Sequence, residues 1–91
     1  MNKSELISEI SSRSHLDKTK VETFLNVFVD VITDTISNGE KVQLVGFGVF
    51  EKRHREPRVG RNPKTGEELT IPAVDVPVFR PGKAFKDSCN K

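Results

Sequence analysis

The chain has 91 residues, 34% of them hydrophobic and 31% charged, with a formal net charge of +2 and a single cysteine. This length predicts one domain whose hydrophobic core is marginal for a chain on its own. Cys89 is the single cysteine, so it could form a disulfide only with another chain. No Cys/His cluster has the spacing of metal ligands. No apolar run is long enough for a signal peptide or a membrane span. We therefore expect a soluble protein with no cofactor, metal or membrane partner, which stays in the compartment where it is made.

Two helices are expected in the first 40 residues. Asn2, with Glu5 three residues later, has the form of a helix cap. The apolar residues that follow at helical spacing are Leu6, Ile7 and Ile10. They predict a short amphipathic helix that ends near residue 12 or 13. Residues 12–16 then read as a turn, and Asp17 is suited to cap the next helix.

The second helix is apolar around most of its circumference. Its hydrophobic residues are Val21, Phe24, Leu25, Val27, Phe28, Val29, Val31, Ile32 and Ile36. A surface helix needs one apolar stripe, so we infer that a second subunit covers part of this one. Asn38-Gly39 is expected to end the helix, because glycine suits the left-handed position after a last turn.

From Lys41 the hydrophobic period changes to two, because Val42 and Leu44 alternate with polar residues, which predicts a strand. Residues 46–48, Gly-Phe-Gly, are expected to reverse the chain into a second strand. Phe47 is interpreted as a packing residue at a sheet or subunit boundary.

This second strand runs into residues 52–64, the most basic segment of the chain. Six cations stand here against the single acid Glu56, which gives a formal charge of +5: Lys52, Arg53, Arg55, Arg58, Arg61 and Lys64. With Val59 as its one large aliphatic residue, the segment cannot bury itself and must project into solvent or onto a partner. A polyanion is the natural partner, because neutralised phosphates release counterions. A solvated charged loop and an arm that grips an acidic protein are the alternatives.

The rest of the chain is expected to return to the sheet and end in a helix. The glycines and the proline of residues 60–66 predict a loop, and residues 67–79 predict a strand with a bulge or kink beside Pro72. Pro81-Gly82 is expected to begin a short last helix. In this helix we expect Ala84 and Phe85 to turn inward, with the lysines of residues 83 and 86 near its start.

No motif supports an enzyme. His15 and His54 have no acidic or cysteine partner at a suggestive local spacing, and the glycines match neither a dinucleotide fingerprint nor a phosphate loop. A helix-turn-helix is a minor alternative, with Lys18, Thr19, Lys20 and Thr23 in a major groove. The apolar character of the second helix argues against it.

Five motifs together point to one family: Met-Asn-Lys-Ser-Glu-Leu at residues 1–6, Val-Gly-Phe-Gly-Val-Phe at 45–50, Gly-Arg-Asn-Pro-Lys-Thr-Gly-Glu at 60–67, Ile-Pro-Ala at 71–73 and Val-Phe-Arg-Pro-Gly-Lys at 78–83. With these motifs the chain resembles the bacterial HU and integration host factor family of DNA-bending proteins over essentially its whole length. The departures are modest. Phe85 and Cys89 replace smaller or aliphatic residues, and Glu56 and Glu68 reduce the positive charge of the arm that contains the basic segment.

The resemblance implies an α+β fold in one domain, residues 1–91. It implies an intertwined homodimer with a helical base (about 1–40), a three-stranded antiparallel sheet per chain that extends into a long β-ribbon arm (about 41–80), and a short C-terminal helix (about 81–91). Each arm would wrap the minor groove, and Pro63 at its tip would enter between base pairs. The implied DNA-binding residues are Arg53, Arg55, Arg58, Arg61, Asn62, Pro63, Lys64 and Thr65 on the arm, and Lys3, Lys83 and Lys86 on the base.

The implied function is that of a histone-like, nucleoid-associated protein of the bacterial cytoplasm. It would bind double-stranded DNA with low sequence specificity, bend it and so compact and stabilise chromosomal DNA, with no small-molecule substrate. Because the minor groove carries a degenerate pattern, flexible or distorted DNA should be preferred over a particular sequence. Sequence-specific bending of the integration host factor type is the alternative, and a heterodimer with a paralogue is left open.

Overall fold

The computed structural model describes residues 1–91 and contains three helices and five strands. In chain order they are α1 (Lys3–Ser14), α2 (Lys18–Ser37), β1 (Val42–Leu44), β2 (Gly48–Arg55), β3 (Arg58–Arg61), β4 (Glu68–Ile71), β5 (Val74–Pro81) and α3 (Lys83–Cys89). The chain divides into two compact units, Met1–Asp34 and Thr35–Lys91. No helix is both long enough and apolar enough to cross a membrane.

α1 begins where the sequence predicts and ends later than predicted. The Asn2 side chain accepts a hydrogen bond from the Glu5 N–H at 2.9 Å, which satisfies one donor of the open first turn. The helix runs to Ser14, beyond the predicted end at residue 12 or 13. His15 then takes a left-handed conformation, with φ at 61°, and its N–H closes the last turn. The turn is therefore shorter than predicted, because the cap is formed by His15.

α2 carries two apolar stripes that differ in burial. One stripe is buried or half-buried and consists of Val21, Leu25, Phe28, Ile32 and Ile36. The other is open to solvent: Phe24 is 69% exposed, Val27 54% and Val31 55%. In the whole chain only three hydrophobic side chains are buried, Ile7, Val21 and Ile36. One chain therefore leaves uncovered much of the apolar surface that its sequence contains.

The end of α2 and the start of the sheet agree with the sequence. Gly39 has a φ of 88°, and its N–H donates to the Ile36 carbonyl at 2.9 Å. After β1, the Phe47 N–H donates to the Leu44 carbonyl at 2.9 Å across a turn that contains Gly46, with φ at 86°. The predicted tight reversal is confirmed, since a positive φ at this turn position favours glycine.

β1, β2 and β5 form a three-stranded antiparallel sheet with β2 in the centre. Gly48 pairs with Leu44 on one side and with Pro81 on the other. An aromatic cluster packs beside these strands, in which the Phe47 ring centroid lies 5.1 Å from that of Phe79 and 5.0 Å from that of Phe85. Phe47 is thus a packing residue, as predicted.

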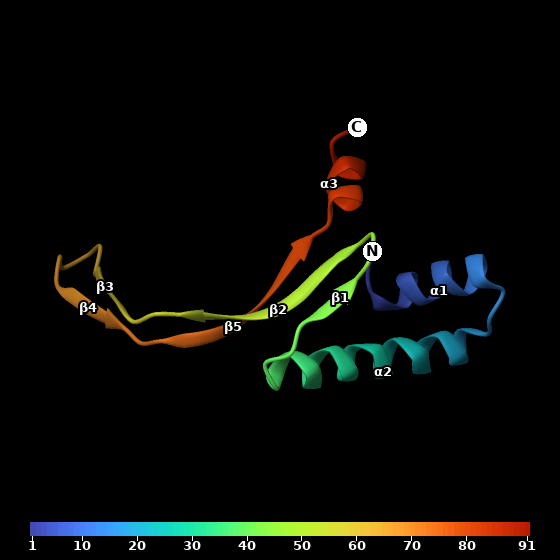
Figure 1. Cartoon of the computed structure of the whole chain (residues 1–91), viewed down its shortest axis with the longest axis horizontal. Coiled ribbons are helices and arrows are strands. Elements are labelled where there is room, and N and C mark those ends of the chain that lie inside the picture. Colours follow the sequence, from blue (N-terminus) through green and yellow to red (C-terminus); the bar gives the residue numbers. More distant parts are fainter. The chain divides into compact units, whose positions relative to one another are not determined.

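β2 and β5 leave this sheet together and are followed by the hairpin of β3 and β4 (Figure 1). We call this ribbon, residues 52–77, the arm. Arg55 pairs with Val74, and Arg58 pairs with Ile71, so two residues separate the two ladders on each strand. The predicted discontinuity at Pro72 is confirmed, but no extra residue forms a bulge. Pro72 stands opposite a second proline, residue 57, and neither has an N–H to donate.

Gly60 was expected in a loop, and this expectation is wrong. It lies in β3 and pairs with Leu69. A Cβ atom at Gly60 would stand 3.3 Å from Ile71 Cδ1, so the missing side chain leaves room for Ile71 to lie across the strand. Gly60 thus allows close packing in the ribbon and does not form a turn. The tip loop is therefore shorter than predicted.

The last helix, α3, begins at Lys83, two residues later than predicted, because Pro81 still belongs to β5 and Gly82 occupies the N-cap position. Phe85 is half-buried against Phe47, whereas Ala84 is exposed in the single chain, contrary to the expectation. Lys86 lies in the last turn, because the helix has only 7 residues. A cation is favourable there, so only Lys83 opposes the helix dipole.

Candidate nucleic-acid interface

The arm places the predicted DNA-binding arginines on two neighbouring stretches of strand. Arg53 and Arg55 lie on β2, Arg58 and Arg61 on β3, and all four side chains are exposed. Within the chain, only Arg53 approaches a carboxylate, 3.8 Å from Glu51. The other three arginines, and Lys64 at the tip, form no ion pair. These cations are therefore solvated and available to an anionic partner.

The tip of the arm is a closed turn made by Asn62, Pro63, Lys64, Thr65, Gly66 and Glu67. The Asn62 N–H donates to the Glu67 carbonyl at 2.8 Å, and the Gly66 N–H donates to the Asn62 carbonyl at 2.7 Å. The Asn62 side-chain oxygen also accepts from the Lys64 N–H at 2.9 Å. Asn62 thus organises the turn from both its main chain and its side chain. The turn holds the exposed Pro63 at the apex of the arm.

His54 has two acidic partners in the structure, Glu56 and Asp75. The expectation that His54 has no acidic partner at a local spacing is wrong, because Glu56 lies only two residues along the chain. His54 Nδ1 lies 2.7 Å from Asp75 Oδ1, and Nε2 lies 3.3 Å from Glu56 Oε1. The hydrogen bond from His54 lowers the pKa of the Asp75 carboxyl below its usual value; desolvation opposes this effect, and the charge of Lys52 supports it. His54 and Asp75 face each other in the β2–β5 register but are 21 residues apart, so only the strand pairing could have predicted the contact.

The predicted site residues outside the arm lie on helices. Lys83 and Lys86 are exposed on α3, and Lys3 is the first residue of α1, where its ammonium donates to Asn26 Oδ1. The structure therefore brings the arm residues together on one ribbon, with these three lysines on other elements. Sequence reasoning missed Arg80, which lies on β5 with its Nε 2.7 Å from Glu51 Oε1.

Comparison with known proteins identifies the family. The family model described as bacterial DNA-binding protein matches residues 1–90. The DNA-binding protein HU of Clostridium pasteurianum is 50% identical over 91 residues, the full length of both chains. DNA-binding protein HU 1 of Bacillus subtilis (strain 168) is 51% identical over 88 residues, or 97% of this chain and 96% of that one. The chain belongs to the HU family of bacterial DNA-binding proteins.

Solved structures of HU proteins share the fold. The Anabaena HU–DNA cocrystal structure is 43% identical in sequence and superposes with a TM-score of 0.90, over 98% of this chain and 97% of that one. HU from Thermotoga maritima is 32% identical, with a TM-score of 0.69 over 98% of each chain. The resemblance inferred from the sequence motifs and the α+β fold of the chain are thus confirmed. As a member of a family of DNA-binding proteins, the chain is not an enzyme.

Proposed function

We propose that this HU-family chain is an architectural DNA-binding protein that acts as a homodimer. It binds double-stranded DNA through the minor groove with low sequence specificity, bends it, and so compacts and stabilises the chromosomal DNA of the bacterial nucleoid, in the cytoplasm. A heterodimer with a paralogue would present the same pair of arms.

The observation that carries this proposal is the arm itself. It is a two-stranded ribbon with exposed cations along both of its ladders and a proline at its apex. A ribbon of this kind has no core of its own, and its charge matches a phosphate backbone. Arg53, Arg55, Arg58, Lys64 and Thr65 would bind phosphates and sugars along the groove. Together with the tip residues they would hold the arm in register with the duplex.

At the tip, Pro63 would act as the wedge. An apolar side chain that enters between base pairs unstacks one step at a cost of a few kcal/mol, and the kink lets the duplex contact more of the protein. Arg61, the last residue of β3, and Asn62, the first residue of the tip turn, precede the wedge and would reach the groove floor and the backbone. The bent flanks of the duplex would then reach Lys3, Lys83 and Lys86.

The homodimer is supported by the apolar surface that one chain leaves open. Phe24, Val27 and Val31 form a solvent-exposed stripe on α2, and no large side chain in the chain is fully buried. A chain of 91 residues with so few buried hydrophobic residues cannot compensate the conformational entropy lost on folding. A second copy that covers this stripe supplies the missing core.

A salt series tests the proposal. Each chain has four arm cations without an ion pair, Arg55, Arg58, Arg61 and Lys64, so a dimer presents eight to phosphate. If all eight make contact, the slope of log affinity against log salt is about −7, and a fourfold rise in salt weakens binding roughly 10⁴-fold. Two unrelated duplexes should give the same slope and similar affinity. A flat salt dependence contradicts DNA binding, and a large preference for one duplex favours the integration host factor type of specific bending.

A further inference from the structure

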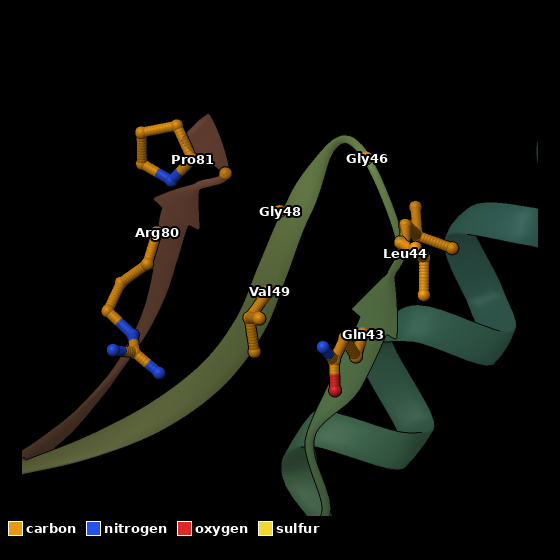
Figure 2. Close-up of a pocket in the computed structure, with 9 residues that line it drawn as sticks. Gln43, Leu44, Gly46, Gly48, Val49, Arg80 and Pro81 are labelled. Atoms are coloured by element: carbon orange, nitrogen blue, oxygen red, sulfur yellow. The ribbon is translucent and has the colours of Figure 1, made fainter. Parts of the chain in front are cut away.

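His54 lies at the root of the arm, where the ribbon leaves the three-stranded sheet, on the face opposite to the arginines of β2. Figure 2 shows the side chains of Val49 and Arg80, which pair with each other, on the same side of their strands. Arg53 and Arg55 lie an even number of residues along β2 from Val49 and share that side. His54 has the opposite parity. The groups around its ring are therefore separate from the exposed guanidinium groups of the arm.

Both ring nitrogens of His54 face a carboxylate. Nδ1 lies 2.7 Å from Asp75 Oδ1, and Nε2 lies 3.3 Å from Glu56 Oε1. A carboxylate can only accept hydrogen bonds, and a neutral imidazole has one N–H, so the neutral ring turns a lone pair toward one of the two acids. The imidazolium ion has two N–H groups and donates to both acids at once. The observed geometry therefore fits the protonated ring.

Three charged groups surround the ring. Asp75 faces it from β5, Lys52 lies two residues before it on β2, and Glu56 follows the end of β2. Lys52 Nζ lies 3.9 Å from Asp75 Oδ2 and donates to the Ser37 carbonyl at the end of α2. No other charged side chain forms an ion pair with any of these groups. The hydrogen bond from His54 lowers the pKa of the Asp75 carboxyl, so this acid stays charged over the pH range in which an imidazole ordinarily titrates.

Glu56 belongs to the break between the two ladders of the arm. The break consists of Glu56 and Pro57 on one strand and of Pro72 and Ala73 on the other. None of these four residues forms a main-chain hydrogen bond outside the strands. The Glu56 carboxylate forms one ion pair, with His54. This contact is therefore the polar link that ties the break to the β2–β5 ladder.

We propose that His54 is a pH-sensitive clamp of the arm. The protonated ring joins Asp75 on β5 to Glu56 at the break and limits the motion of the β3–β4 hairpin against the β2–β5 ladder. The neutral ring keeps Asp75 and releases Glu56. The consequence for nucleic acid rests on the proposed DNA binding: a hairpin that is ordered in advance loses less conformational entropy on the duplex, so binding tightens as the pH falls from 8 to 6.

Hydrogen exchange in the free protein tests the clamp without DNA. After correction for the intrinsic exchange rate at each pH, the amides of β3 and β4 should be more protected at pH 6 than at pH 8. An exposed ion pair shifts such an opening equilibrium about two- to fivefold per chain. His54→Gln should abolish this difference. Equal protection at the two pH values in wild type, or a difference that survives in His54→Gln, overturns the clamp.

His15→Asn is the matched control. It removes the only other imidazole of the chain, which forms no ion pair, and asparagine tolerates the left-handed backbone of residue 15. This variant should keep the pH difference of wild type. Loss of the difference in His15→Asn would assign the effect to the wrong histidine and overturn the clamp.

Glu56→Gln separates the clamp from a mere gain of charge, by DNA titrations at pH 8 and pH 6. Protonation of His54 adds a positive charge in any case, and this alone favours a polyanion. If the clamp needs Glu56, the variant binds the duplex more tightly than wild type at pH 8, because an acid is lost, but gains less affinity on acidification. A gain equal to that of wild type overturns the clamp.

Circular dichroism checks that the variants remain folded, and if His54→Gln does not, Glu56→Gln still decides. Wild-type protein that binds no duplex at either pH refutes the proposed function, whereas hydrogen exchange in the free protein decides the clamp separately.

Discussion

Phe24→Ala is the most direct perturbation of the proposed dimer. The ring is 69% exposed in the single chain and belongs to the open apolar stripe of α2, so we expect the partner subunit to cover it. Replacement of a buried Phe by Ala costs about 3–5 kcal/mol. Because about two thirds of the side chain is exposed in the single chain, we assign about two thirds of that cost to the contact with the partner. The loss of this contact costs about 2–3 kcal/mol per chain, or about 4–6 kcal/mol per dimer. At 1.4 kcal/mol per factor of ten, the dimer dissociates roughly 10³- to 10⁴-fold more readily.

Sedimentation equilibrium over a range of micromolar concentrations measures the association, and thermal unfolding at two concentrations measures its link to stability. For wild type, we expect the thermal midpoint to rise by about 4 °C for each tenfold increase in protein concentration, because dissociation accompanies unfolding. Phe24→Ala should lower the midpoint and shift the onset of association to higher concentration. A wild-type monomer that is folded, with a midpoint independent of concentration, would refute the reasoning.

Two further variants provide a matched control. Val31→Ala and Val59→Ala remove the same two methyl groups from side chains of similar exposure, 55% and 66%. Val31 belongs to the open stripe of α2, and Val59 lies on β3 of the arm. Only Val31→Ala should weaken association. Equal effects would mean that the stripe is not the contact surface.

Two remaining predictions concern the stability of the sheet and the arm root. A Cβ atom at Gly48 would lie 2.6 Å from the Arg80 carbonyl oxygen and from the Phe79 ring, so Gly48→Ala should destabilise the fold by about 1–3 kcal/mol in denaturant titration. Gly60→Ala, which meets only the flexible end of Ile71, should cost clearly less, and equal losses would contradict this difference in packing between the two glycines. Because the pKa of Asp75 is lowered on folding, its contribution to stability is present above its ordinary value of 3.8 and is lost as the pH falls through the lowered value. Asp75→Asn should therefore be less stable than wild type at pH 6 and should match it in strong acid, and a difference that persists there would exclude this cause.

The sequence was sufficient for features that depend on neighbouring residues. The Asn2 cap, the left-handed Gly39 and the Gly46 turn each follow from a residue type at a position where local geometry demands it. The two strands of the arm and the break beside Pro72 were also predicted, because hydrophobic period and proline chemistry are local signals.

Features that depend on strand register could not be predicted in this way. Gly60 looked like a turn residue until its pairing with Leu69 placed it under Ile71. The contact of His54 with Asp75, and the cations gathered around Glu51, join residues that are far apart in sequence. These contacts depend on which residues stand opposite each other in paired strands. A single sequence does not determine that register.

The central claim is that two proline-tipped arms bend the duplex that they bind. Fluorescence transfer between dyes at the two ends of a short duplex measures this directly, with wild type and Pro63→Ala compared at saturating protein. The account predicts that wild type shortens the end-to-end distance, and that Pro63→Ala still binds and folds but leaves the duplex straighter. A saturated wild-type complex with the end-to-end distance of free DNA would contradict it.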